Sequence, residues 1–113
     1  MNIESTLKLM IDIISEKKFI SLKTIDISSI SSFSDYFIIV STDNLRQNNS
    51  MSDEFLEKLL ESNIKPYRIE GLNTDWILID FGDIIVHFFT EEKRLFYNLE
   101  KVWADGRIVE INN

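Results

Sequence analysis

The sequence predicts an α/β fold of mixed α+β type, in which a sheet of about five strands is covered by helices. Two observations support this fold class. Stretches with apolar residues at helical spacing alternate with short runs rich in β-branched residues, and two of these runs are separated only by Gly82-Asp83. A chain of 113 residues with 44% hydrophobic content suits one core and is too short for two. We therefore expect a single domain over residues 1–113.

The first segments of the chain predict one helix followed by two strands. Residues 2–18 place apolar side chains on one face of an amphipathic helix. Residues 23–28 alternate with period two, which is typical of a half-buried strand. Residues 36–40 are almost entirely apolar, as expected for a strand that is covered on both faces.

A second helix and a short third strand are predicted next. Residues 51–61 repeat the helical pattern, but Asn44, Asn48 and the polar residues beside them are weak helix formers, so the start of this helix stays open. Pro66 favours extended backbone at the residue before it, and residues 67–70 form a short strand that enters a polar loop.

Residues 76–89 predict a β-hairpin whose two faces differ in chemistry. Gly82-Asp83 signals a two-residue turn because Gly tolerates the positive φ that right-twisted strands require. Strand side chains alternate, so one face is wholly apolar, and the other carries aromatic residues, a carboxylate and the only histidine of the chain. The pairs on the apolar face are Phe81 with Ile84, Ile79 with Val86 and Ile77 with Phe88; the pairs on the mixed face are Asp80 with Ile85, Leu78 with His87 and Trp76 with Phe89.

The last predicted element is a helix that begins after Thr90. Thr90 is a suitable N-cap, and the carboxylates of Glu91 and Glu92 fall where the helix dipole favours negative charge. Gly106 is expected to end this helix. Its predicted apolar stripe consists of Leu95, Leu99, Val102 and Trp103.

The charge and composition disfavour several kinds of function. The formal charge is −7 and no basic cluster is larger than Lys17-Lys18, which argues against direct binding of nucleic acid. An acidic surface suits a basic protein partner, although net charge alone also serves to keep a small protein soluble. With no cysteine and one histidine, neither a thiolate nor a histidine-based metal site is available.

The same totals predict where the protein works. No apolar run approaches the ~20 residues that a membrane-spanning helix needs. The N-terminus lacks the basic and apolar segments of a secretory signal, and the lack of cysteine favours a reducing compartment. We expect a soluble, cytoplasmic protein that does not bind membranes.

The mixed face of the hairpin is the candidate partner-binding surface. Trp76, Leu78, Asp80, His87 and Phe89 share this face, and interfaces concentrate binding energy in aromatic anchors with a charged rim. The alternative is that helices cover both faces of the sheet, which would make Trp76 and Phe89 ordinary core residues. The residues alone leave both interpretations open.

Other polar residues near this face have their own predicted roles. Asp80 needs a partner because an unpaired buried carboxylate is costly, and Arg94 is the internal candidate. His87 lies diagonal to Asp80 in this register, so the carboxylate could orient the imidazole as in acid–base catalysis. A structural histidine is the better interpretation, because neither a nucleophile nor a set of metal ligands accompanies it. Tyr97 and Glu100 are neighbours on the last helix and form either a solvated face or part of the partner surface.

Six short motifs are distributed along the chain between residues 5 and 105. They are Ser34-Asp35-Tyr36-Phe37, Glu70-Gly71, Trp76-x-Leu78-x-Asp80, Gly82-Asp83-x-x-Val86-His87-x-Phe89, Arg94-x-x-Tyr97-x-Leu99-Glu100 and Trp103. In this order and at these spacings, the motifs resemble the ribosomal silencing factor family, also called the Iojap family.

The resemblance implies a fold related to nucleotidyltransferases, without known catalysis and without a cofactor. It implies a factor that binds the large ribosomal subunit through the basic ribosomal protein uL14 and so blocks joining of the small subunit, with a further role in large-subunit biogenesis. Members of the family also form dimers, so a homodimer is a further expectation. The residues expected to bind uL14 are Trp76, Leu78, Asp80, His87, Arg94, Tyr97 and Glu100.

The alternative function is a metal-dependent nucleotidyltransferase or a nucleotide-binding domain. Such chemistry needs two or three carboxylates around magnesium, commonly supplied by a Gly-Ser turn that is followed by Asp-x-Asp. Ser41-Thr42 lacks the glycine, and no Asp-x-Asp occurs in the sequence. An enzyme is therefore the weaker hypothesis.

Overall fold

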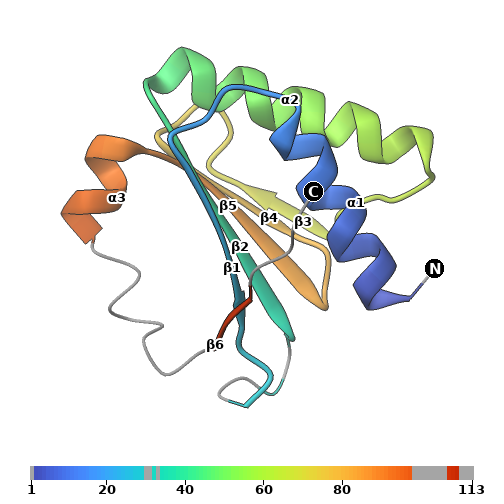
Figure 1. Cartoon of the computed structure of the whole chain (residues 1–113). Coiled ribbons are helices and arrows are strands. Elements are labelled where there is room, and N and C mark those ends of the chain that lie inside the picture. Colours follow the sequence, from blue (N-terminus) through green and yellow to red (C-terminus); the bar gives the residue numbers. More distant parts are fainter. Residues whose placement is uncertain (1, 30–31, 33, 98–106, 110–113) are drawn as a thin grey trace.

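Helices cover a six-stranded mixed sheet in the computed structural model, which describes residues 2–29, 32, 34–97 and 107–109 (Figure 1). The elements in chain order are α1 (Ile3–Ser15), β1 (Ser21–Asp26), β2 (Tyr36–Thr42), α2 (Leu45–Glu61), β3 (Arg68–Glu70), β4 (Trp76–Asp80), β5 (Ile84–Thr90), α3 (Glu91–Tyr97) and β6 (Arg107–Val109). The strand order is β3-β4-β5-β2-β1-β6. Helices α1 and α2 lie on one face of the sheet, and α3 lies on the opposite side (Figure 1).

The predicted fold class is confirmed, and so are the five predicted strands. The sheet also contains a sixth strand, β6, that the sequence pattern did not reveal. Its three residues pair antiparallel with residues 24–26 of β1. A strand this short has too few positions to show an alternating pattern, so it is recognised only from its pairing.

The centre of the sheet is a parallel pair, β2 with β5, in which Tyr36 lies opposite Ile84 and Thr42 opposite Thr90. The start of β2 is tied to the hairpin turn, because the amide of Asp35 donates to the carbonyl of Asp83 at 2.8 Å. All other neighbouring strands in the described part of the sheet pair antiparallel.

The predicted register of the hairpin is confirmed from end to end. Strand β4 pairs with β5 so that Trp76 lies opposite Phe89 and Asp80 opposite Ile85. The amide of Phe81 donates to the carbonyl of Ile84 at 2.9 Å, which closes the turn. Gly82 adopts a φ of +91°, the backbone geometry for which a glycine was expected here.

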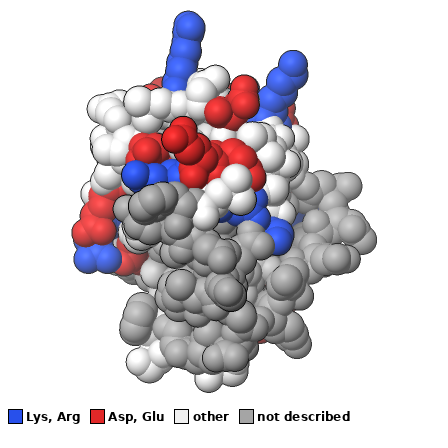
Figure 2. All heavy atoms as spheres, turned by 90° about the vertical axis from the view of Figure 1, so that its left-hand side faces the viewer, with Lys and Arg blue, Asp and Glu red and all other residues white. Residues whose placement is uncertain are grey.

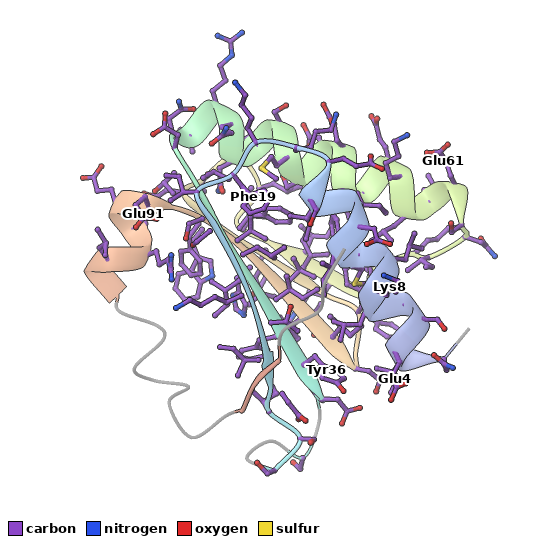
Figure 3. The ribbon with its side chains drawn as sticks, viewed as in Figure 1. Glu4, Lys8, Phe19, Tyr36, Glu61 and Glu91 are labelled. Carbon is purple, nitrogen blue, oxygen red and sulfur yellow. The ribbon has the colours of Figure 1, made fainter. Side chains whose placement is uncertain are left out.

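The apolar face of the hairpin packs against α1 and α2, as predicted. Phe19, in the loop after α1, also packs against this layer, between the helices and the sheet (Figure 3). The buried residues of this core include Ile77, Ile79, Val86 and Phe88 from the hairpin, Leu7, Met10, Ile11 and Ile14 from α1, and Met51, Phe55 and Leu59 from α2.

Helix α2 begins earlier than its apolar pattern indicated, at Leu45, with Asn44 as its N-cap. The Oδ1 atom of Asn44 accepts from the amide of Gln47 at 2.8 Å. Asn48 is fully buried, and its side-chain amide donates to the carbonyls of Thr74 (3.1 Å) and Phe88 (3.0 Å). These tertiary hydrogen bonds outweigh the weak helix propensity of asparagine, which had left the start of this helix open.

Candidate partner-binding surface

Strand β4 presents alternate side chains on the sheet face that α1 and α2 leave free. These side chains are Trp76, Leu78 and Asp80, and we call them the β4 surface. Each of the three is partly buried and partly exposed. Their cross-strand neighbours on β5 are all buried, so the exposed part of the face begins at β4. The register predicted from the sequence therefore brings these three side chains together.

The indole of Trp76 is held in one orientation by two neighbours on β5. Its Nε1–H donates to Nδ1 of His87 at 3.2 Å. Its ring stacks on Phe89 with a centroid distance of 4.9 Å and an interplanar angle of 28°. A large aromatic side chain is thus fixed from one side and remains partly exposed on the other.

His87 is a buried, neutral histidine with 4% of its surface exposed. Phe37 contacts its ring edge-on at a centroid distance of 4.9 Å. Burial lowers the pKa of His87 to about 4. Because Nδ1 accepts from Trp76, the neutral ring carries its proton on Nε2, and this buried atom has no hydrogen-bond partner among the described residues. The structural interpretation of His87 fits this environment, and its hydrogen bond runs to Trp76 rather than to Asp80.

Asp80 finds its partners on its own side of the sheet, so Arg94 is wrong as the predicted partner. Its Oδ1 accepts from the amide of Gly82 at 2.7 Å, and its Oδ2 lies 3.6 Å from a guanidinium nitrogen of Arg68. Register explains the pairing, because Arg68 lies directly opposite Asp80 on β3. The carboxylate is 23% exposed and still reaches the surface.

Arg94 instead fixes α3 to the sheet. Its guanidinium donates to the hydroxyls of Ser21 and Ser41, the latter at 2.9 Å, and lies 3.7 Å from a carboxylate oxygen of Glu91. The side chain is only 11% exposed. Strand register aligns Ser21, Ser41 and Phe89 with Trp76 across the sheet, so Arg94 lies over the same face as the β4 surface.

The rest of the predicted last helix is only partly within the described residues. Thr90 caps α3 as predicted, since its Oγ1 accepts from the amide of Lys93 at 3.4 Å. Leu95 was expected on the packed stripe but is 70% exposed, because Glu91 and Arg94 occupy the side of α3 that meets the sheet. Tyr97 is the last residue of α3. Four predicted positions, Leu99, Glu100, Val102 and Trp103, lie outside the described residues, as does the predicted helix end at Gly106.

The loop before β4 is positioned by residues whose role the sequence did not reveal. Asn48 holds this loop through the carbonyl of Thr74, two residues before Trp76. Gly71 has a φ of +76°, and a Cβ added to it would lie 2.2 Å from the carbonyl oxygen of Trp76. The signal available in the sequence was the helical spacing of Asn48, three residues before Met51 and seven before Phe55, which puts a polar side chain on the apolar face of this helix.

Acidic side chains are prominent on the side of the molecule that carries α3 (Figure 2). Asp43, Asp75 and Glu92 line one hollow of about 430 Å³ beside Thr90, where β5 ends. Lys93 lies 3.7 Å from Asp75 and offsets part of this charge. The arrangement agrees with the net charge of −7 and gives this side an acidic character.

Comparison with known proteins decides the family. Residues 1–113 match the family described as "Ribosomal silencing factor during starvation". The chain belongs to this family. The ribosomal silencing factor of Zymomonas mobilis is 38% identical over 104 residues, which cover 91% of this chain and 78% of that protein. The predicted resemblance is thereby confirmed.

Two further relatives extend the comparison. A crystal structure of a protein from Chromobacterium violaceum superposes with a TM-score of 0.85 at 27% identity, covering 92% of this chain and 88% of that one. A mouse protein named "Mitochondrial assembly of ribosomal large subunit protein 1" is 36% identical over 76 residues, which cover 64% of this chain and 33% of that protein. The family members matched here are named as silencing or assembly factors rather than as enzymes.

Two kinds of feature are absent from the described residues. No three His, Asp or Glu side chains in the described part of the chain gather closely enough to hold a metal ion. Among the same residues, none of the helices is both long and apolar enough to cross a membrane.

Proposed function

We propose that this protein is a translational repressor that binds uL14 on the large ribosomal subunit and sterically blocks association with the small subunit. The observation that carries the proposal is the β4 surface, where a partly exposed Trp76 is fixed on a strand beside Leu78 and Asp80. The names of the relatives, which refer to ribosomal silencing and to large-subunit assembly, support it.

The chemistry of the β4 surface suits a protein interface. Tryptophan is among the residues that contribute most to binding free energy, and it does so best when it is rigid and surrounded by apolar neighbours. Trp76 meets both conditions through Phe89 and Leu78. Asp80 adds a carboxylate to the rim, where it would meet a cationic side chain of the partner.

Charge complementarity supports a basic partner such as uL14. The net charge of −7 and the acidic residues on the α3 side of the molecule raise the association rate with a basic surface. We propose that Tyr97 and Glu100 contribute to the same interface. Arg94 would act from beneath it, because its guanidinium is used to hold α3 on the sheet.

Repression by this mechanism requires no chemical step. A factor that occupies the surface on which two subunits meet prevents their joining for as long as it stays bound, so affinity and position determine the effect. We propose that it acts in the cytoplasm, without a cofactor, and that it also serves in large-subunit biogenesis. We further propose a homodimer, which sedimentation at tens of micromolar protein would test; a monomer there would refute it.

The test of the proposed function is co-sedimentation with isolated large and small bacterial ribosomal subunits at two salt concentrations. We expect the protein to pellet with the large subunit alone, and less at high salt. Trp76→Ala should weaken this binding about tenfold or more while the protein stays folded. The matched control is Tyr67→Ala, which removes an aromatic ring that is 84% exposed. This ring lines a groove with Ile3 and Phe81, on the face of the sheet opposite to the β4 surface.

Three outcomes would contradict parts of this proposal. Failure to pellet with either subunit would refute ribosome binding by this chain. Unfolding of Trp76→Ala, seen by circular dichroism, would show that Trp76 is a core residue. Pelleting with the large subunit without inhibition of subunit joining, measured by light scattering, would refute the blocking mechanism.

A further inference from the structure

His87 is an unusual choice for its position. It is 4% exposed, and the rings of Phe37 and Phe89 lie beside it. Its Nε2 is buried and has no hydrogen-bond partner among residues 2–29, 32, 34–97 and 107–109. A phenylalanine would fill this place without leaving a polar atom unsatisfied, so packing alone does not account for the imidazole.

We propose that His87 is a positioning residue for partner binding: its Nδ1 accepts the indole N–H of Trp76 and holds that ring in the orientation in which the partner meets it. The proposal rests on the proposed function, since it assigns His87 a role in the same interface. His87 itself is buried and would not touch the partner.

Phe89 and His87 restrict the indole of Trp76 in different ways. Stacking on Phe89 at 4.9 Å supports the plane of the indole but leaves the ring free to turn within that plane or to flip over. The hydrogen bond of 3.2 Å to Nδ1 distinguishes one edge of the ring from the other and thereby selects one rotamer. A side chain that is already fixed before binding loses less conformational entropy when the partner arrives.

Three substitutions at position 87 separate positioning from packing. His87→Phe keeps a planar ring of similar size but removes the acceptor and the unsatisfied Nε2–H. His87→Asn keeps an acceptor oxygen near the place of Nδ1 but leaves empty volume. His87→Leu removes both the ring and the acceptor.

Binding and stability should therefore rank His87→Phe and His87→Asn in opposite orders. We expect His87→Phe to be at least as stable as the parent protein and to bind the large subunit about fivefold more weakly. His87→Asn should be less stable than His87→Phe but should bind more tightly per folded molecule. Ile39→Val, on the same buried face, is the control for a packing change without a hydrogen bond, and its binding should equal that of the parent.

A double-mutant cycle with Trp76→Phe tests whether His87 acts through Trp76. Phenylalanine has no N–H, so adding His87→Phe to Trp76→Phe should cause no further loss of binding. An equal loss in both backgrounds would overturn the proposal. If Trp76→Phe itself leaves binding to the large subunit unchanged, the proposed interface fails instead, which distinguishes the two failures.

A second measurement does not need the ribosome. In ¹H–¹⁵N spectra, the indole N–H of Trp76, assigned from its loss in Trp76→Phe, should exchange with solvent faster in His87→Phe and His87→Leu than in the parent. Asparagine at position 87 should restore part of the protection. Unchanged exchange in His87→Phe and His87→Leu would overturn the proposal even if one of these variants proved too unstable for binding assays.

Discussion

Asn48 and Phe88 are joined by a hydrogen bond of 3.0 Å that runs from a helix side chain to a strand carbonyl 40 positions further along the chain. The same amide donates to the carbonyl of Thr74, and its Oδ1 accepts from the hydroxyl of Thr42 at 2.9 Å. One buried side chain therefore connects α2, both central strands and the loop that leads to Trp76.

Asn48→Ala should destabilise the protein by about 3 kcal/mol, because it removes three hydrogen bonds, of which those with Thr42 and Phe88 are buried. Urea unfolding followed by circular dichroism measures the change. Asn49→Ala is the matched control on the same helix, since the Oδ1 of Asn49 has no hydrogen-bond partner within the described part of the chain. We expect the control to be neutral, and an equal loss in both variants would show that the hydrogen bonds of Asn48 are not responsible.

The stability of the protein should fall as the pH drops from about 6.5 to about 4, the pKa values of His87 in the unfolded and folded states. Within that range the unfolded state binds the proton and the folded state does not, so acid favours unfolding. The loss that is due to His87 amounts to about 2 kcal/mol at pH 5 and is complete below pH 4.

Urea unfolding at pH 7 and pH 5 tests this prediction. Carboxylates also titrate toward the acid end of this range, and His87→Phe isolates the contribution of the histidine because it keeps them all. The difference in stability between the two pH values should be smaller in His87→Phe by the amount given above. The same pH dependence in both proteins would contradict the assignment to His87.

Gly71→Ala should destabilise the loop before β4 by about 2 kcal/mol or more, because its φ is +76° and the added Cβ meets the carbonyl oxygen of Trp76. Thermal unfolding measures the loss. Asn73→Gly serves as the control: Asn73 has a φ of +65° in the same loop, and glycine adopts that conformation without strain. The control should be neutral or slightly stabilising, and a stable Gly71→Ala would mean that this loop rearranges freely.

Asp80 should contribute to partner binding mainly through the association rate. Asp80→Lys is expected to weaken binding to the large subunit and to reduce its dependence on salt. Asp80→Asn is the informative companion, because an amide oxygen still accepts from Gly82 and preserves the turn while the charge is lost. We expect about threefold weaker binding for Asp80→Asn. If Asp80→Asn binds like the parent at low salt, electrostatics at this residue has no part in recognition.

The sequence predicted the hairpin in full because two local rules agreed there. The Gly82-Asp83 turn sets the pairing, and alternation then assigns each side chain to a face, so the pairing of Trp76 with Phe89 followed directly. The side chains that support this surface were harder to predict. Asn48 was masked by its low helix propensity, and the partner of Asp80 lay on β3, whose pairing no local rule specified.

The contacts of the charged residues on α3 could not be predicted from the sequence. Arg94 was predicted as the partner of Asp80, which needed one, whereas it bonds two serines that adjoin only after β1 and β2 have paired. Leu95 was placed on the packed side of α3 by spacing, but the buried Arg94 decides which side faces the sheet. Long-range polar contacts of this kind depend on the finished topology and leave no periodic pattern in the sequence.

The parallel pairing of β2 with β5 also determines when this protein can become functional during its own synthesis. Residues 36–42 find their central partner only in residues 84–90, so the ribosome has made most of the chain before the middle of the sheet can close. Until then β2 is an apolar strand with an open edge, the kind of segment that chaperones bind and that aggregates when it persists. A nascent or truncated chain that ends before β5 therefore has no β4 surface to offer to the partner proposed above.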